Sequence, residues 1–170
     1  MRRFVLPIAA AVLLLTTACN NGKATPTVDG SVPIGKPAAS KLDATSAFKQ
    51  LSAAVPTAKL SGTVTADNDP NHLLGRPNQY TSKITFTDSR IKASDVQFTK
   101  PGDVDRGGAI EVFTDPTDAA ARAKYIQAVT KSMPALAEYD YVHGTVLVRV
   151  SHYLTPAQAA AYKAAADGLS

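Results

Sequence analysis

The sequence predicts an α+β domain, built from a mainly antiparallel sheet of four to five strands with helices on one face. Two observations lead to this fold class. Segments with the two-residue period of half-buried strands follow one another through the middle of the chain, and segments with helical spacing precede and follow them. The helical segments also begin with residues that cap helices. A ferredoxin-like arrangement is the expected topology, and a cystatin-like wrap of the sheet around the first helix is the alternative.

The first helix is expected to begin after Asp43, which is a suitable N-cap residue. Phe48, Leu51 and Val55 recur at the spacing of one helical face. Pro56 then ends the helix, because proline cannot continue its hydrogen-bond ladder.

Strands are expected after this helix, over residues 59–65, 79–88, 93–98 and 109–113. The pattern is clearest in residues 79–88, where two sets of side chains alternate. One set is Tyr80, Ser82, Ile84 and Phe86, and the other is Thr81, Lys83, Thr85 and Thr87. Such alternation is typical of a strand with one face in the core.

The C-terminal part of the chain is expected to contain two more helices with a strand between them. Asp115 and Pro116 predict the start of the first of these helices. Thr155 and Gln158 have the spacing of a capping box and predict the start of the last. Between the two helices, residues 142–151 have the most regular strand pattern of the chain.

Two charged residues, Glu111 and Arg149, interrupt apolar runs of predicted strands. We expect both to point to the same, less buried face of the sheet, together with Lys83 and Thr85. If the helices cover only the valine-rich face, this second face is open to solvent and could serve as a binding surface.

The composition argues against a nucleic-acid partner and against stabilisation of the fold by disulfides. The chain has 18 basic and 14 acidic residues, for a net charge of +4. The basic residues are scattered singly, whereas nucleic-acid binding needs them clustered on one face, so no nucleic-acid partner is expected. A single cysteine allows no intramolecular disulfide, and the domain must therefore depend on an apolar core.

The N-terminus has the layout of a secretory signal peptide. Arg2 and Arg3 precede about a dozen apolar residues, a run too short to span a bilayer, and small residues then lead to Cys19. This end resembles the lipobox of bacterial lipoproteins, although Thr16 stands where that family usually has an aliphatic residue. The resemblance implies that residues 1–18 are removed and that the Cys19 thiol receives a diacylglycerol.

The same resemblance implies that the mature protein is anchored by acyl chains, such as palmitate, to the extracytoplasmic face of the cell membrane. Residues 19–41 are then the lipidated cysteine and a flexible linker, because proline and glycine are frequent there and no hydrophobic period is present. Residues 42–170 are expected to form a single α+β domain.

Residues 67–80 (DNDPNHLLGRPNQY) are the least generic stretch of the chain. With the three residues that follow, they resemble a segment of uncharacterised lipoproteins of high-GC Gram-positive bacteria, which implies a bacterial origin and no particular activity. The loop is long for a strand connection, and such loops are often functional. His72, Arg76, Asn78 and Tyr80 are the candidate ligand-binding residues, since they offer donors for a carboxylate, a sugar or a peptide backbone. An ordered turn that satisfies its own polar groups is the alternative.

No cofactor and no metal are expected. Residues with oxygen ligands stand at every second position in two segments, Asp67-x-Asp69-x-Asn71 and Asp103-x-Asp105, as they do in calcium loops. Neither segment completes the calcium-loop pattern. The motifs of serine hydrolases, zinc proteases and phosphate-binding loops are also absent from the sequence.

These observations predict a membrane-tethered, non-enzymatic binding or interaction module of the cell envelope. Its partner would be an envelope protein, an envelope polymer or a small ligand. The alternative is an envelope hydrolase with a site near His72 that uses a carboxylate such as Asp69.

Overall fold

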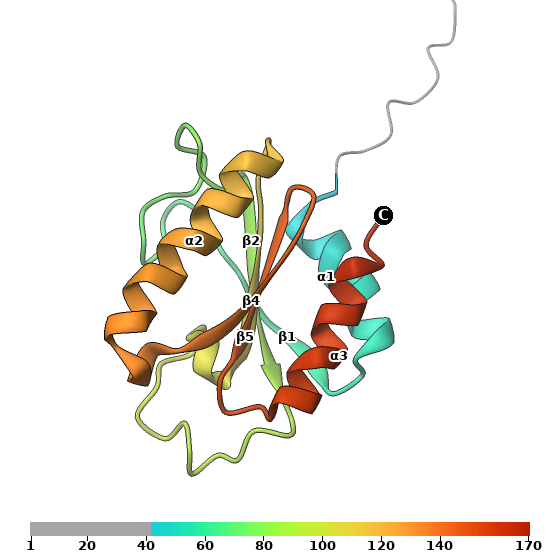
Figure 1. Cartoon of the computed structure of the whole chain (residues 1–170), viewed down its shortest axis with the longest axis vertical. Coiled ribbons are helices and arrows are strands. Elements are labelled where there is room, and N and C mark those ends of the chain that lie inside the picture. Colours follow the sequence, from blue (N-terminus) through green and yellow to red (C-terminus); the bar gives the residue numbers. More distant parts are fainter. Residues whose placement is uncertain (1–41) are drawn as a thin grey trace, which may run out of the picture. The chain divides into compact units, whose positions relative to one another are not determined.

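The computed structural model describes residues 42–170, so the expectations for the signal peptide, Cys19 and the linker lie outside the described residues. The described chain contains three α-helices, two short 3-10 helices and five strands (Figure 1). The helices are α1 (Ala44–Ala54), α2 (Pro116–Ser132) and α3 (Pro156–Asp167), with short 3-10 helices η1 (Val104–Arg106) and η2 (Pro134–Leu136). The strands are β1 (Ala58–Thr63), β2 (Ser82–Asp88), β3 (Gly107–Val112), β4 (Glu138–His143) and β5 (Val146–Ser151).

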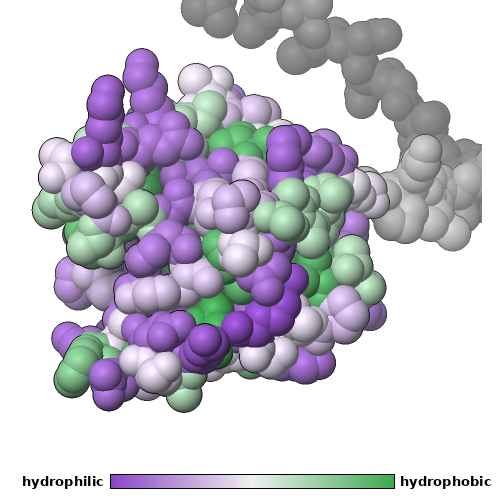
Figure 2. Space-filling model, turned by 60° about the horizontal axis from the view of Figure 1, so that its bottom comes forward, coloured by the Kyte–Doolittle hydropathy of each residue, from purple (hydrophilic) through white to green (hydrophobic). Residues whose placement is uncertain are grey.

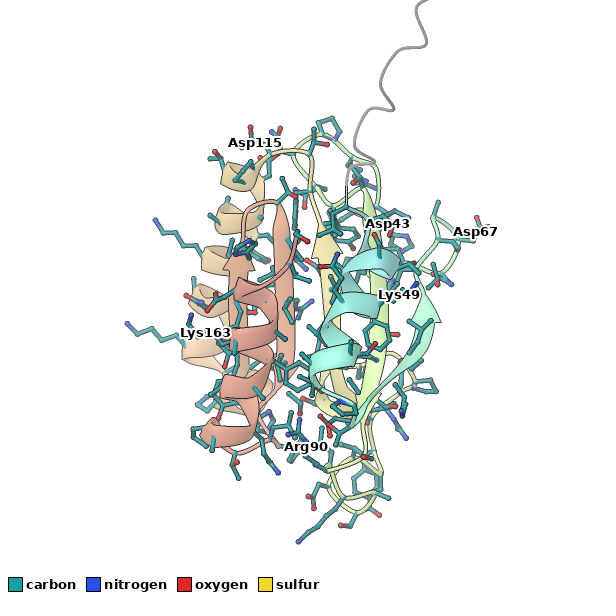
Figure 3. The ribbon with its side chains drawn as sticks, turned by 90° about the vertical axis from the view of Figure 1, so that its right-hand side faces the viewer. Asp43, Lys49, Asp67, Arg90, Asp115 and Lys163 are labelled. Carbon is teal, nitrogen blue, oxygen red and sulfur yellow. The ribbon has the colours of Figure 1, made fainter. Side chains whose placement is uncertain are left out.

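The helices begin at the caps that the sequence predicts. Asp43 and Ser46 form a capping box, in which the Asp43 carboxylate accepts a hydrogen bond from the Ser46 N–H at 2.7 Å. The Asp115 carboxylate accepts a hydrogen bond from the Thr117 N–H, in the first turn of α2, at 2.7 Å. Asp43 and Asp115 are labelled in the upper half of Figure 3. Thr155 and Gln158 form the second capping box, at the start of α3. Each cap satisfies N–H groups that a helix leaves unpaired at its start.

The five strands form one sheet in the order β1-β2-β3-β5-β4, and every neighbouring pair is antiparallel. α2 leads from β3 to β4, and β5 turns back to lie between these two strands. Residues 93–98, expected as a short strand, form turns instead. The arrangement confirms the α+β class that the ferredoxin-like and cystatin-like expectations share.

The sheet lies between two helical layers (Figure 1). α1 and α3 cover one face, over a core that includes Ile84, Ile110 and Val148. α2 covers the other face, so the expectation that the helices share one face is wrong for α2. The physical reason is that this second face carries Leu147, whose side chain is fully buried and needs an apolar cover, which α2 supplies with Ile126 and alanines.

Residues 142–151 form a hairpin instead of the single strand that the sequence predicts. Gly144, between β4 and β5, adopts a φ of 53°, a left-handed conformation that glycine reaches without steric cost. Val142 therefore lies opposite Leu147 on the α2 face, apart from the valines of β5.

A buried carboxylate fixes α3 to the sheet. Asp88, at the end of β2, accepts a hydrogen bond from the Tyr162 hydroxyl of α3 at 2.5 Å. It also accepts from the Arg90 guanidinium at 2.9 Å. Burial alone would raise the pKa of Asp88, but these hydrogen bonds keep it below its ordinary value.

Candidate functional site

A second buried carboxylate, Asp69, organises the loop between β1 and β2. Its side chain accepts hydrogen bonds from the backbone N–H groups of Asn71, Leu73 and Leu74 at 3.1, 2.8 and 2.9 Å. The Tyr80 hydroxyl donates to the same carboxylate at 2.7 Å. Burial alone would raise the pKa of Asp69, but these donors lower it to about 2. The loop is therefore ordered around a permanent negative charge.

The four residues that the sequence singles out in this loop do not form one site. His72 and Arg76 are exposed and border a small hollow of about 220 Å³ that also reaches Asp69. Arg76 and Asn78 border a different hollow of about 620 Å³, beside the start of α2. Tyr80 is fully buried, so it anchors the loop and is not accessible to a ligand. His72 and Asn78 both adopt a positive φ, of 53° and 60°, as tight turns require.

A third buried carboxylate, Glu111, lies at the centre of the α2 face with no exposed surface. Three cations from three elements contact it. Lys83 Nζ of β2 lies 2.9 Å and Arg149 Nη1 of β5 3.1 Å from Glu111 Oε1, and Arg122 Nε of α2 lies 3.1 Å from Oε2. Burial alone would raise the pKa of Glu111, but the three positive charges hold it below its ordinary value. We call these four residues the Glu111 cluster.

Arg149 joins the cluster to the acidic edge strand β4. Its Nε and Nη2 donate to the two oxygens of Glu138 at 2.8 and 2.9 Å, which is a bidentate pair. Asp140, on the same face of β4, has both carboxylate oxygens buried and without a hydrogen-bond donor among the described residues. Burial and the neighbouring charge of Glu138 raise the pKa of Asp140 to about 7.

An open cleft of about 690 Å³ lies beside the Glu111 cluster, between α2, the β1–β2 loop and η1. Lys83, Arg122 and Arg149 of the cluster border it. Its apolar side is made by Leu73, Tyr125, Ile126, Val129 and Leu136, and its remaining polar side includes Asp103, Asp105 and Glu138. A cleft of this size, with an apolar side and a few convergent charges, is typical of small-molecule sites.

The sequence-based expectation for Glu111 and Arg149 is correct on the shared face and wrong on its exposure. They share the face with Lys83 and Thr85, as expected, but α2 covers it, so it is not an open sheet surface. Arg122 was not identified from the sequence. A signal was present, because Arg122 stands three residues after the buried Ala119 and so falls beside the inward stripe of α2.

The described residues offer no sign of a metal site or of a membrane-spanning segment. Within residues 42–170, no three His, Cys, Asp or Glu side chains come together as metal ligands would. None of the helices in that range has the length and apolar character needed to cross a membrane. In comparisons with known proteins, no family model, no curated protein and no solved structure matches the chain.

Removal of the Tyr80 hydroxyl is expected to destabilise the domain. Tyr80→Phe leaves the buried Asp69 carboxylate with one strong donor fewer, and we expect a loss of about 1–3 kcal/mol in the free energy of unfolding by urea at pH 7. Asp67→Asn is the matched control, because Asp67 is exposed on the same loop and projects from the domain (Figure 3); it should change stability by less than about 0.5 kcal/mol. Equal effects of the two substitutions would contradict this role of Asp69.

Asp140→Asn is expected to stabilise the protein in a pH-dependent way. In the unfolded chain Asp140 has the ordinary aspartate pKa of 3.8, whereas in the folded protein its pKa is about 7. The native protein therefore loses stability as the pH rises from about 4 to 7, and the variant does not. Because the side chain is partly screened by solvent, the gain above pH 7 should be about 1–2 kcal/mol, and it should vanish near pH 3.5.

Urea unfolding across this pH range measures the difference. Asp95→Asn, at an exposed position, serves as the control and should follow the native protein at every pH. A constant difference between Asp140→Asn and the native protein from pH 3.5 to 8 would show that Asp140 ionises normally.

Proposed function

We propose that this chain is a non-enzymatic binding module of the bacterial cell envelope, and that the cleft beside α2 is its binding site. One observation carries the proposal: a cleft of about 690 Å³ brings an apolar helix face together with the buried cations of the Glu111 cluster. Charged side chains that are withdrawn from water and border a cleft are candidates for a functional site.

Among the three kinds of partner considered, the surface favours a small ligand. On the face drawn in Figure 2, hydrophilic residues dominate and hydrophobic residues form separate patches. Docking of a large protein partner usually depends on a broader continuous apolar area. A small ligand instead needs a concave site of the size that the cleft provides.

The lipobox-like N-terminus supports attachment at the extracytoplasmic face of the membrane through a lipid on Cys19. A diacylglycerol buries two acyl chains at about 0.8 kcal/mol for each methylene, which exceeds the marginal binding of a single chain. In this proposal the lipid holds the binding module at the membrane surface and takes no part in the cleft.

The hydrolase alternative receives little support from the surroundings of His72. The nearest carboxylate in its hollow is Asp69, whose oxygens already accept four hydrogen bonds and whose pKa is about 2. Such a group is a poor general base at neutral pH. In the part of the chain that the structure describes, the His72 ring is hydrogen-bonded to neither an acid nor a hydroxyl.

Cys19→Ala is expected to abolish lipid attachment. The protein should then move from the membrane fraction to the medium, or remain as a precursor of larger mass, because the modified thiol directs both anchoring and cleavage in the family that the N-terminus resembles. Fractionation and intact-mass measurement test this, with Asn20→Ala as the control that should remain membrane-bound. A Cys19→Ala protein of unchanged mature mass in the membrane would contradict the lipoprotein proposal.

A bulky substitution in the cleft is expected to block binding. Val129 lines the cleft, so Val129→Trp should fill part of it, whereas Ala128→Trp places the same side chain on the exposed side of α2. The test is an amide NMR titration of the full Cys19→Ala chain with a mixture of neutral, cationic and anionic fragments. Binders should perturb amides around the cleft in the parent chain and in Ala128→Trp, and not in Val129→Trp. If no fragment of any charge perturbs the cleft, the binding proposal is wrong.

A further inference from the structure

The Glu111 cluster has hydrogen-bond donors that the protein itself does not use. Arg122 engages Glu111 through Nε alone, and among residues 42–170 its two terminal Nη groups have no hydrogen-bond acceptor. Lys83 Nζ contacts Glu111 and lies 5.0 Å from the centre of the Tyr80 ring, which leaves further N–H donors on the ammonium. Both side chains border the cleft, and both are largely withdrawn from water, at 12% and 5% exposed.

The charges around the cluster do not balance. Lys83, Arg122 and Arg149 are positive, and the two carboxylates that contact them are Glu111 and Glu138. Within these ion pairs the cations therefore exceed the carboxylates by one, although Asp103 and Asp105 also border the cleft on its η1 side. A cation that is largely withdrawn from water gains from an additional acceptor, so a single negative charge beside Arg122 and Lys83 would be stabilised.

The other charged groups in reach limit the ligand to one negative charge. Asp103 and Asp105 border the same cleft on the η1 side and repel negative charge, the more strongly the larger the charge of the ligand, so they disfavour a ligand with two negative charges. Asp140 faces Arg149 from β4 and does not border the cleft. The site is therefore unsuited to a dianion such as a phosphate monoester.

The apolar side of the cleft begins directly beside these donors. Tyr125 follows Arg122 by one helical turn, and the guanidinium carbon lies 5.8 Å from the centre of the Tyr125 ring. Tyr125 and Leu136 are 62% and 52% exposed, which is high for such large apolar side chains. Ile126 and Val129 continue this surface along α2. A ligand whose polar group binds these donors would place its apolar part against this surface of α2.

We propose that the cleft binds small amphiphilic monocarboxylates, with the carboxylate between Lys83 Nζ and the Nη groups of Arg122 and the apolar body along α2. A carboxylate fits because its two oxygens can accept from the planar guanidinium fork and from an ammonium at once. The assignment rests on the proposed function, namely that the cleft is a binding site, and adds the chemical class of the ligand.

Octanoate, octanol and octylamine are the probes, since they share one apolar body and differ in head-group charge. We measure their affinity for the full Cys19→Ala chain by calorimetry and by NMR shifts of cleft amides. Octanoate should bind at least about tenfold more tightly than octanol, because only octanoate meets both donors. Octylamine should bind more weakly than octanol, because its charge has the same sign as the donors.

Two substitutions test the donors. Arg122→Gln and Lys83→Met should each weaken octanoate binding at least about tenfold and leave octanol binding unchanged. Arg122→Lys keeps the charge without the fork and should recover part of the affinity. Lys124→Gln is the matched control, because Lys124 lies on α2 in an exposed position away from the cleft. Arg122→Gln is the decisive variant if Lys83→Met does not fold, since Arg122 lies at the rim.

Each contrary outcome has a distinct meaning. Equal affinities for octanoate and octanol would overturn the carboxylate assignment and leave the binding proposal in place. Octanoate binding that resists both Arg122→Gln and Lys83→Met would overturn it as well. Inorganic phosphate that competes with octanoate at similar concentration would show a general anion site, which also contradicts the assignment. Failure of all probes of every charge to bind would count against the binding function itself.

Discussion

The buried carboxylate of Glu111 is the constraint on which the α2 side of this protein depends. A charge without any exposed surface is stable only where opposite charges and donors surround it, and here these come from β2, β5 and α2. Arg122 thereby ties α2 to the middle of the sheet. On the opposite face, Ile84 and Ile110 lie in an apolar core with residues of α1 and α3, and the buried carboxylate of that side, Asp88, lies at the end of β2. The cleft lies on the α2 face, where the buried charges are at the centre of the sheet.

Two further buried carboxylates also hold neighbouring elements in place, at the borders of the sheet. Asp88 holds α3 through the Tyr162 hydroxyl, and Asp69 holds the β1–β2 loop through Tyr80 and backbone N–H groups. The Asp69 interactions matter for the cleft, because the loop they fix places Leu73 in the cleft wall. The loop in which the sequence places the candidate ligand-binding residues thus forms part of the lining of a cleft whose cations lie on other elements.

The proposed ligand class follows from unused hydrogen-bond donors rather than from an unusual residue. Arg122 keeps Nη groups that no acceptor among residues 42–170 takes up, Lys83 contacts Glu111, and both side chains border the cleft. Because these side chains are largely withdrawn from water, an acceptor placed between them is bound more strongly than it would be by exposed groups. A binding site of this kind needs no catalytic motif.

The sequence by itself determined the local structure: the caps at Asp43, Asp115 and Thr155, the α+β class, and the shared face of Glu111 and Arg149. These depend on neighbours along the chain or on the alternation of a strand, so residue types suffice to predict them. The tertiary structure alone decided that α2 crosses to the other face, that Glu111 is buried, and that Arg122 and Lys83 both contact it beside a cleft. Those features depend on which elements pack together, and spacing along the chain carries no information about distances between elements that fold back on one another.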